Sequence, residues 1–189
     1  MFNKIKRMVN MFRYGFHSEC LEDYAKQIQA SVDNAPEDRD AYTIYHDKFV
    51  IGNGARYATL FIGKRNDLYV PVIVKEKKMK ELSENLNKFT NLHELGHFKY
   101  HIDKTTGKQY PPEELDYELF VENDADAYAA QQMGLGKAVE ALYELKESDV
   151  VHGDKMLEAH IDLRIQLLTG KVSRAKLEST YILTKPVID

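Results

Sequence analysis

The chain has 189 residues, of which 43% are hydrophobic and 30% are charged, and its formal charge is −4. The length and composition predict one folded domain spanning residues 1–189, without an interdomain linker, and exclude a disordered chain. The acidic balance, with no basic stripe, argues against nucleic-acid binding.

The N-terminal part, residues 1–35, is predicted to be helical. Met1–His17 is basic, and its apolar residues recur at helical spacing, so it could pack on the domain or contact a membrane surface. No stretch of the chain approaches the roughly 20 apolar residues that span a bilayer, and we expect no secretory signal. Cys20 is the only cysteine, which excludes an intrachain disulfide and favours a reducing, cytoplasmic location.

Residues 42–74 are predicted to form a small antiparallel sheet. Aromatic and β-branched residues indicate three strands, over Tyr42–Ile51, Arg56–Ile62 and Leu68–Val74. Gly52-Asn53-Gly54 predicts a hairpin between the first two strands. Pro71 has no backbone N–H to donate, which places the third strand at an edge of the sheet.

Residues 77–170 follow a helical pattern, which completes an α+β fold. A long helix from Lys77 should end near Ile102-Asp103. Pro111-Pro112-Glu113-Glu114 predicts the start of a helix that runs to about Met133 and is closed by Gly134. Two further helices are expected over Lys137–Lys146 and Asp154–Leu168, and another one before the sheet over Glu19–Ala30.

The pattern His93-Glu94-Leu95-Gly96-His97 is the most informative feature of the chain. Residues four apart lie on one face of an α-helix, so His93 and His97 can direct two imidazoles at one metal ion. Glu94 then lies beside the open coordination position, where its carboxylate can take a proton from a metal-bound water. The pattern therefore predicts a zinc site with Glu94 as general base.

A catalytic zinc needs a third protein ligand, which leaves one position for water. Glu122 is the candidate, because it lies on the next predicted helix, 25 residues after His97. Asp126 follows one turn later and can accept the second N–H of a metal-bound imidazole. Glu118, one turn before Glu122, is a rival ligand, but the residue four positions after it is Glu122 rather than an aspartate.

Two neighbouring features have simpler interpretations. His101 continues the series of histidines, but it lies about 12 Å of helical rise from His93, too far for both to bind one ion. A partly charged imidazole at the carboxyl end of the helix is the better interpretation. The charge run Lys75–Lys80 indicates a solvated helix start.

Two strings carry a family resemblance: Phe89–His97 (FTNLHELGH) and Glu122–Ala129 (ENDADAYA). Together they resemble the gluzincin metallopeptidases, which combine HExxH with a later glutamate in an ExxAD or ExxAN setting. The first string resembles the ImmA/IrrE-type peptidases, which cleave repressors. The later part resembles soluble relatives of the HtpX and CAAX-prenyl endopeptidases, whose C-terminal motif is echoed in His160–Leu167 without its usual proline. The resemblance covers Phe89–Leu168 with gaps.

This resemblance implies a zincin-like domain that hydrolyses peptide bonds with Zn²⁺ and acts on a protein or peptide substrate. Glu94 would remove the proton of the attacking water and pass it to the leaving amine. The resemblance makes His160 the candidate donor to the oxyanion, with Tyr117, Tyr128 and Arg164 behind it. Arg164 could instead pair with a nearby carboxylate. The edge of the strand that contains Pro71 could bind an extended substrate by strand addition.

Two alternatives stay open. An ImmA/IrrE-like regulatory protease would cleave one transcription factor, although the first 75 residues show no convincing helix-turn-helix. A metal-binding interaction protein would keep the site without catalysis. Glu94 argues against this second alternative, because a structural zinc site has no use for a free carboxylate at the water position.

Overall fold

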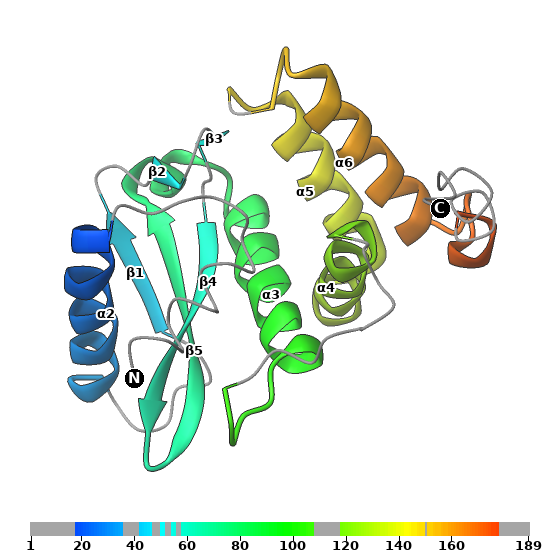
Figure 1. Cartoon of the computed structure of the whole chain (residues 1–189). Helices are drawn as coiled ribbons and strands as arrows, with labels where there is room; N and C mark the ends of the chain where they lie inside the picture. The colour runs from blue at the N-terminus through cyan, green and yellow to red at the C-terminus, as the bar shows by residue number, and fades with distance from the viewer. Residues whose placement is uncertain are drawn as a thin grey trace, which may run out of the picture.

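The computed structural model describes residues 18–35, 42–46, 50–51, 54–55, 58–107, 118–149 and 151–177. It confirms an α+β fold with a small sheet (Figure 1). The predicted helix over Met1–His17 and the predicted helix start at Pro111-Pro112 lie outside the described residues. Within the described part of the chain, no helix has the length and apolar character needed to cross a membrane.

The main sheet has three strands in the order β1 (Tyr42–His46), β5 (Leu68–Glu76) and β4 (Ala58–Arg65). β5 pairs antiparallel with β4 but parallel with β1, so the predicted all-antiparallel sheet is wrong. Two short strands on either side of residues 52–53, β2 (Val50–Ile51) and β3 (Gly54–Ala55), do pair antiparallel, but they make a pair separate from the main sheet. The main strands before and after these two short strands therefore do not pair with each other.

Pro71 lies in the central strand, so the prediction that it lies in an edge strand is wrong. Its partner on β4 is Ile62. On the other side, the described register with β1 begins only at Val72, opposite Tyr42. The proline thus precedes the stretch of β5 that has neighbours on both sides, where a missing backbone donor would break a ladder.

Helices cover both faces of this sheet. On one face, α2 (Ser18–Asp33) packs its Ile28 and Val32 against Val72 and Val74 of β5. The opposite face of the sheet meets α3 (Glu84–His101), and Figure 1 shows the sheet between the two helices. Because successive side chains of a strand point to opposite faces, β5 is buried on both sides, which explains its nearly continuous apolar sequence.

α3 is preceded by a short 3₁₀ helix, η1 (Lys77–Glu81), so the regular helix begins later than the sequence pattern predicts. Ser83 is its N-cap, and the Ser83 hydroxyl accepts a hydrogen bond from the backbone N–H of Leu86. The helix ends where expected, since Ile102 is already extended. One cap thus sets where the histidine-bearing helix starts.

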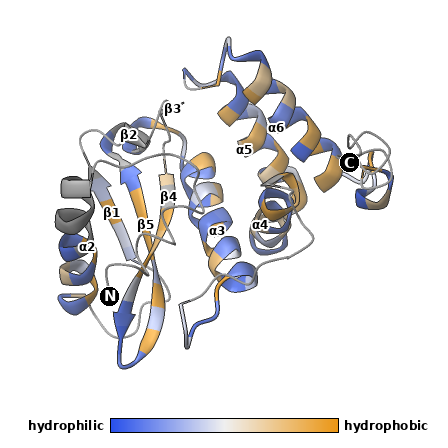
Figure 2. Ribbon diagram, in the orientation of Figure 1, coloured by the Kyte–Doolittle hydropathy of each residue, from blue (hydrophilic) through white to orange (hydrophobic). Residues whose placement is uncertain are grey.

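The remaining helices form a layer on the far side of α3: α4 (Glu118–Met133), α5 (Leu135–Glu147) and α6 (Lys155–Leu168) (Figure 1). The predicted boundaries of α5 and α6 agree with these ranges to within two residues. Their core includes Leu142, Ile161 and Ile165, together with Phe89 of α3. Figure 2 shows that α3, although it lies between the sheet and this layer, is hydrophilic along much of its length. The polar residues that it buries form the candidate site.

Candidate metal centre

Close packing of α3 against α4 brings the site together. Gly96 of α3 lies against Ala125 of α4 so closely that a Cβ at residue 96 would be 2.8 Å from the Cα of Ala125 and 3.0 Å from its carbonyl oxygen. Ala125 and Ala129 are fully buried. Small residues on both helices therefore allow a backbone-to-backbone approach, and side chains one turn from this contact can meet.

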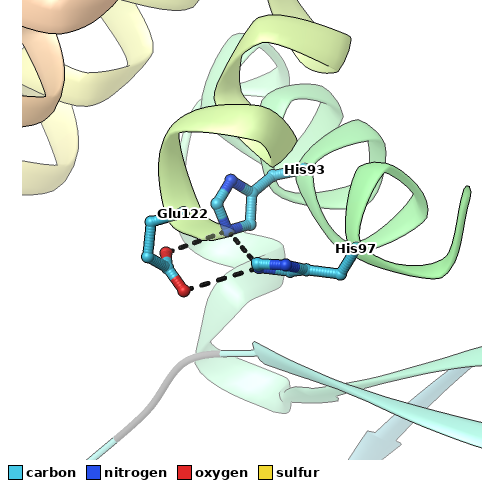
Figure 3. Close-up of side chains that lie close together, drawn as sticks. All are labelled: His93, His97 and Glu122. Carbon is cyan, nitrogen blue, oxygen red and sulfur yellow. Dashed lines mark hydrogen bonds and ion pairs between the residues drawn. The ribbon is translucent and has the colours of Figure 1, made fainter. Parts of the chain in front are cut away.

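His93, His97 and Glu122 converge at this crossing (Figure 3). The Nε2 atoms of the two histidines lie 3.0 Å apart. One carboxylate oxygen of Glu122 lies 3.2 Å from Nε2 of His93, and the other lies 3.5 Å from Nε2 of His97. Both imidazoles are buried and the glutamate is half-buried. Three side chains from two helices thus direct their metal-ligating atoms at one point.

These separations fit a tetrahedral ion. Four ligand atoms at about 2.0–2.1 Å from a tetrahedral zinc lie about 3.3–3.4 Å from one another. The three separations between the ligand atoms, 3.0, 3.2 and 3.5 Å, bracket that value. Two neutral nitrogens and one carboxylate oxygen are also a donor set that zinc accepts, with one position left open. The residues present therefore fit the metal that the sequence pattern implies.

Asp126 fixes the orientation of His93. Its Oδ1 lies 2.8 Å from Nδ1 of His93, and the carboxylate is fully buried. Because a carboxylate accepts, Nδ1 must carry the proton, and this leaves the Nε2 lone pair of His93 free to face a metal. The structure therefore places Asp126 against the outer nitrogen of a candidate ligand.

Arg164 of α6 anchors both carboxylates. Its Nε and Nη2 donate to the two oxygens of Asp126 at 2.8 and 2.6 Å, and its Nη1 lies 3.2 Å from Glu122. Burial is the largest single effect on Glu122 and Asp126 and acts to raise their pKa values, but the Arg164 charge and the contacts with His93 together outweigh it and lower both pKa values. A buried, bidentate arginine therefore holds the two acids ionised and oriented. Of the two roles considered for Arg164, the structure shows pairing with carboxylates.

The electrostatic balance at His93 favours its protonated form while no metal is bound. Burial acts to lower the pKa of His93, but hydrogen bonds to Asp126 and Glu122 and their negative charges raise it to about 10. A metal ion that binds Nε2 must therefore displace a proton, and it then takes over the interaction with Glu122. The site is built for positive charge between the two carboxylates.

Glu94 is buried on α3, and its negative charge acts on the ammonium of Lys75 of β5. Lys75 is fully buried, so its interpretation as part of a solvated helix start is wrong. β5 extends to Glu76, and Lys75 lies on the same face of the sheet as Ile73. Its ammonium donates to the backbone carbonyl of Asn87 in the first turns of α3, at 3.1 Å.

The other candidates take different positions. His160 is half-buried on α6, one turn before Arg164. The side chain of Glu118 and all of Tyr117 lie outside the described residues. Tyr128 of α4 packs edge-to-face on Tyr100 of α3.

His101 is buried, and its pKa is lowered by burial and then by the neighbouring His97. These effects disfavour the partly charged imidazole that the sequence led us to expect at this position.

Sequence reasoning missed two residues that shape the site. Gly96 sits inside the histidine motif, but its contact with α4 depends on a partner 29 positions away. Lys75 directly follows the apolar run Val72-Ile73-Val74 of a predicted strand, and this position was the signal in the sequence for its burial. The chain matches no protein-family model, no curated protein and no solved structure.

Proposed function

We propose that the protein is a zinc-dependent metalloendopeptidase of gluzincin type. The convergence of His93, His97 and Glu122 at tetrahedral spacing carries this proposal. The buried carboxylate of Glu94, next to His93 in the chain, adds the group that hydrolysis needs. The anchoring of Asp126 by Arg164 gives the ligand set the rigid support that a metal site requires.

When bound, zinc would lower the pKa of its water to about 7 and polarise the carbonyl of the substrate. His93, His97 and Glu122 would hold it. Glu94 takes the proton from the attacking water and delivers it to the leaving amine, so that the same carboxylate acts first as base and then as acid. His160 stays the candidate donor to the developing negative charge on the carbonyl oxygen.

The substrate would be a protein or peptide in extended conformation. Strand addition at β5 is excluded, because β5 is the central strand. Among the described strands, β4 is the edge strand that also packs against α3, through Leu60 and Phe98. An extended chain that paired with β4 would run alongside the helix that carries His93 and His97. The single cysteine, Cys20, fits a cytoplasmic enzyme.

A cleavage assay tests the proposal. Zinc-loaded protein is incubated with a peptide library, and cleavage products are identified by mass spectrometry for the wild type, Glu94→Gln and the control Glu84→Gln. Glu84 is exposed on α3. We expect cleavage by the wild type and the control, and a loss of about 100-fold or more in Glu94→Gln with zinc retained, because only the general base is removed.

The same assay separates catalysis from metal binding alone. Stoichiometric zinc without cleavage of any peptide or protein would contradict the peptidase proposal and favour a non-catalytic metal-binding protein. Full activity in Glu94→Gln would remove Glu94 from the mechanism. Cleavage confined to a single protein target would point to a regulatory protease.

A further inference from the structure

Lys75 is one of the largest fully buried side chains among the described residues, and the proposed chemistry does not use it. It lies on the face of β5 that meets α3, next to the apolar Ile73. Its Nζ donates to the backbone carbonyl of Asn87 at 3.1 Å and contacts the Asn87 side-chain oxygen at 3.5 Å. Both partners are neutral, and among the described residues no carboxylate forms an ion pair with this ammonium.

A buried ammonium without a bonded carboxylate is unfavourable for folding. Burial lowers the pKa of Lys75 from 10.5 to about 8, and the negative charge of Glu94 opposes this shift. A methionine would fill nearly the same volume without loss of hydration. The position of this lysine therefore calls for an explanation other than stability, and Glu94 is the acid whose charge acts on it.

The polar residues of α3 lead from Lys75 to Glu94. Asn87, Asn91 and Glu94 are spaced by four and three residues, which places them on one face of the helix. The side-chain oxygen of Asn91 is buried and has no hydrogen-bond partner within the described part of the chain. An apolar interface would not contain these groups. They form a polar strip, half-buried at Asn87 and Asn91, from the sheet to the buried carboxylate of the proposed general base.

We propose that Lys75 is a positioning residue for Glu94. The buried positive charge of Lys75 draws the Glu94 carboxylate to this face of α3 and holds it beside the attacking water. Lys75 acts through Glu94 and does not itself contact the substrate. The inference rests on the proposed peptidase function for its catalytic consequence. The electrostatic link between the two residues does not depend on that function.

The kinetic test compares Lys75→Met with the control Lys88→Met, which removes an exposed lysine from α3. We expect Lys75→Met to bind zinc as the wild type does and to keep or raise Tm. Its kcat should fall about 10-fold or more, while KM stays within about twofold, because only the orientation of the base is lost. Unchanged kcat would overturn the proposal, as would a loss of activity that follows a loss of Tm.

A second test needs no activity. Tm is measured for zinc-loaded wild type, Lys75→Met, Glu94→Gln and the double variant. We expect Glu94→Gln to lower Tm in the presence of Lys75, since it leaves the ammonium without its opposite charge, and to do so much less in the Lys75→Met background. Additive effects would overturn the link.

If Lys75→Met does not fold, Lys75→Gln replaces it, and failure of both would show a purely structural role, contrary to the proposal. A protein that binds zinc but cleaves nothing would contradict the peptidase function, whereas the Tm comparison would still decide whether Lys75 and Glu94 are coupled.

Discussion

Gly96→Ala should damage the proposed metal centre without changing any of its candidate ligands. The added Cβ would lie 2.8 Å from the Cα of Ala125 and 3.1 Å from the Cβ of Tyr128. Carbon atoms in favourable contact lie about 3.5–4.0 Å apart, so α4 must move away by about 0.7 Å or more. Backbone atoms cannot rotate aside as a side chain can. We therefore expect a loss of about 1–3 kcal/mol in the free energy of unfolding.

The same displacement would carry Glu122, one turn before Ala125, away from the histidines. Its oxygens now lie 3.2 and 3.5 Å from the two imidazole nitrogens. A metal site tolerates errors of only about 0.5 Å, so zinc affinity should fall about tenfold or more. Competition with a chromophoric chelator measures the affinity, and urea denaturation measures stability.

Gly136→Ala is the matched control. Gly136 lies in α5, and a Cβ there meets nothing within 4 Å. This variant should gain up to about 1 kcal/mol in stability, because alanine favours a helix over glycine, and should keep its zinc affinity. Gly96→Ala protein with wild-type zinc affinity and stability would refute the argument that this contact positions Glu122.

Two further variants test the charges. Asp126→Asn should weaken zinc binding about 10–100-fold in chelator competition. It should also destabilise the protein by about 3–5 kcal/mol in urea denaturation, because buried Arg164 loses its charged partner. The control Asp124→Asn should leave zinc affinity unchanged, and equal effects of the two variants on zinc affinity would contradict this prediction. The pKa of Lys75 is about 8 in the folded protein and 10.5 in the unfolded chain. The charge of Lys75 therefore destabilises the folded state by its full amount below pH 8, and this destabilisation disappears as the pH rises to 10.5. The stability advantage of Lys75→Met over wild type should therefore shrink by about 3 kcal/mol over that range, and a constant difference in pH-dependent denaturation would show that Lys75 is not buried as a cation.

The helices and the histidine pair could be predicted because their signals are local. The spacing of His93 and His97 and the N-cap Asp154 of α6 depend only on neighbours within a turn or two. The choice of Glu122 and Asp126 needed one step more, a second helix that folds back on the first. The chemistry of a metal ligand and of its hydrogen-bond acceptor supplied that step.

The order of the strands could not be predicted in the same way. The antiparallel pairing of Val50–Ile51 with Gly54–Ala55 is local and does form. In contrast, β5 lies between β1 and β4 through pairings that no local pattern encodes. Pro71 predicted an edge strand because only its missing N–H is visible in the sequence, whereas the position of β5 between two other strands is not. The burial of Lys75 follows from this topology, since only a central strand covered by α3 could take its side chain out of water.

The most direct test of the account is the zinc content of the purified protein, measured for the wild type, Glu122→Ala and Glu118→Ala. The account predicts about one zinc per chain in the wild type and in Glu118→Ala, and none in Glu122→Ala, because a catalytic site needs three protein ligands. Zinc that is lost in Glu118→Ala but kept in Glu122→Ala would contradict the ligand set of Figure 3. A wild-type protein that binds no zinc, even after reconstitution, would contradict the metal centre itself.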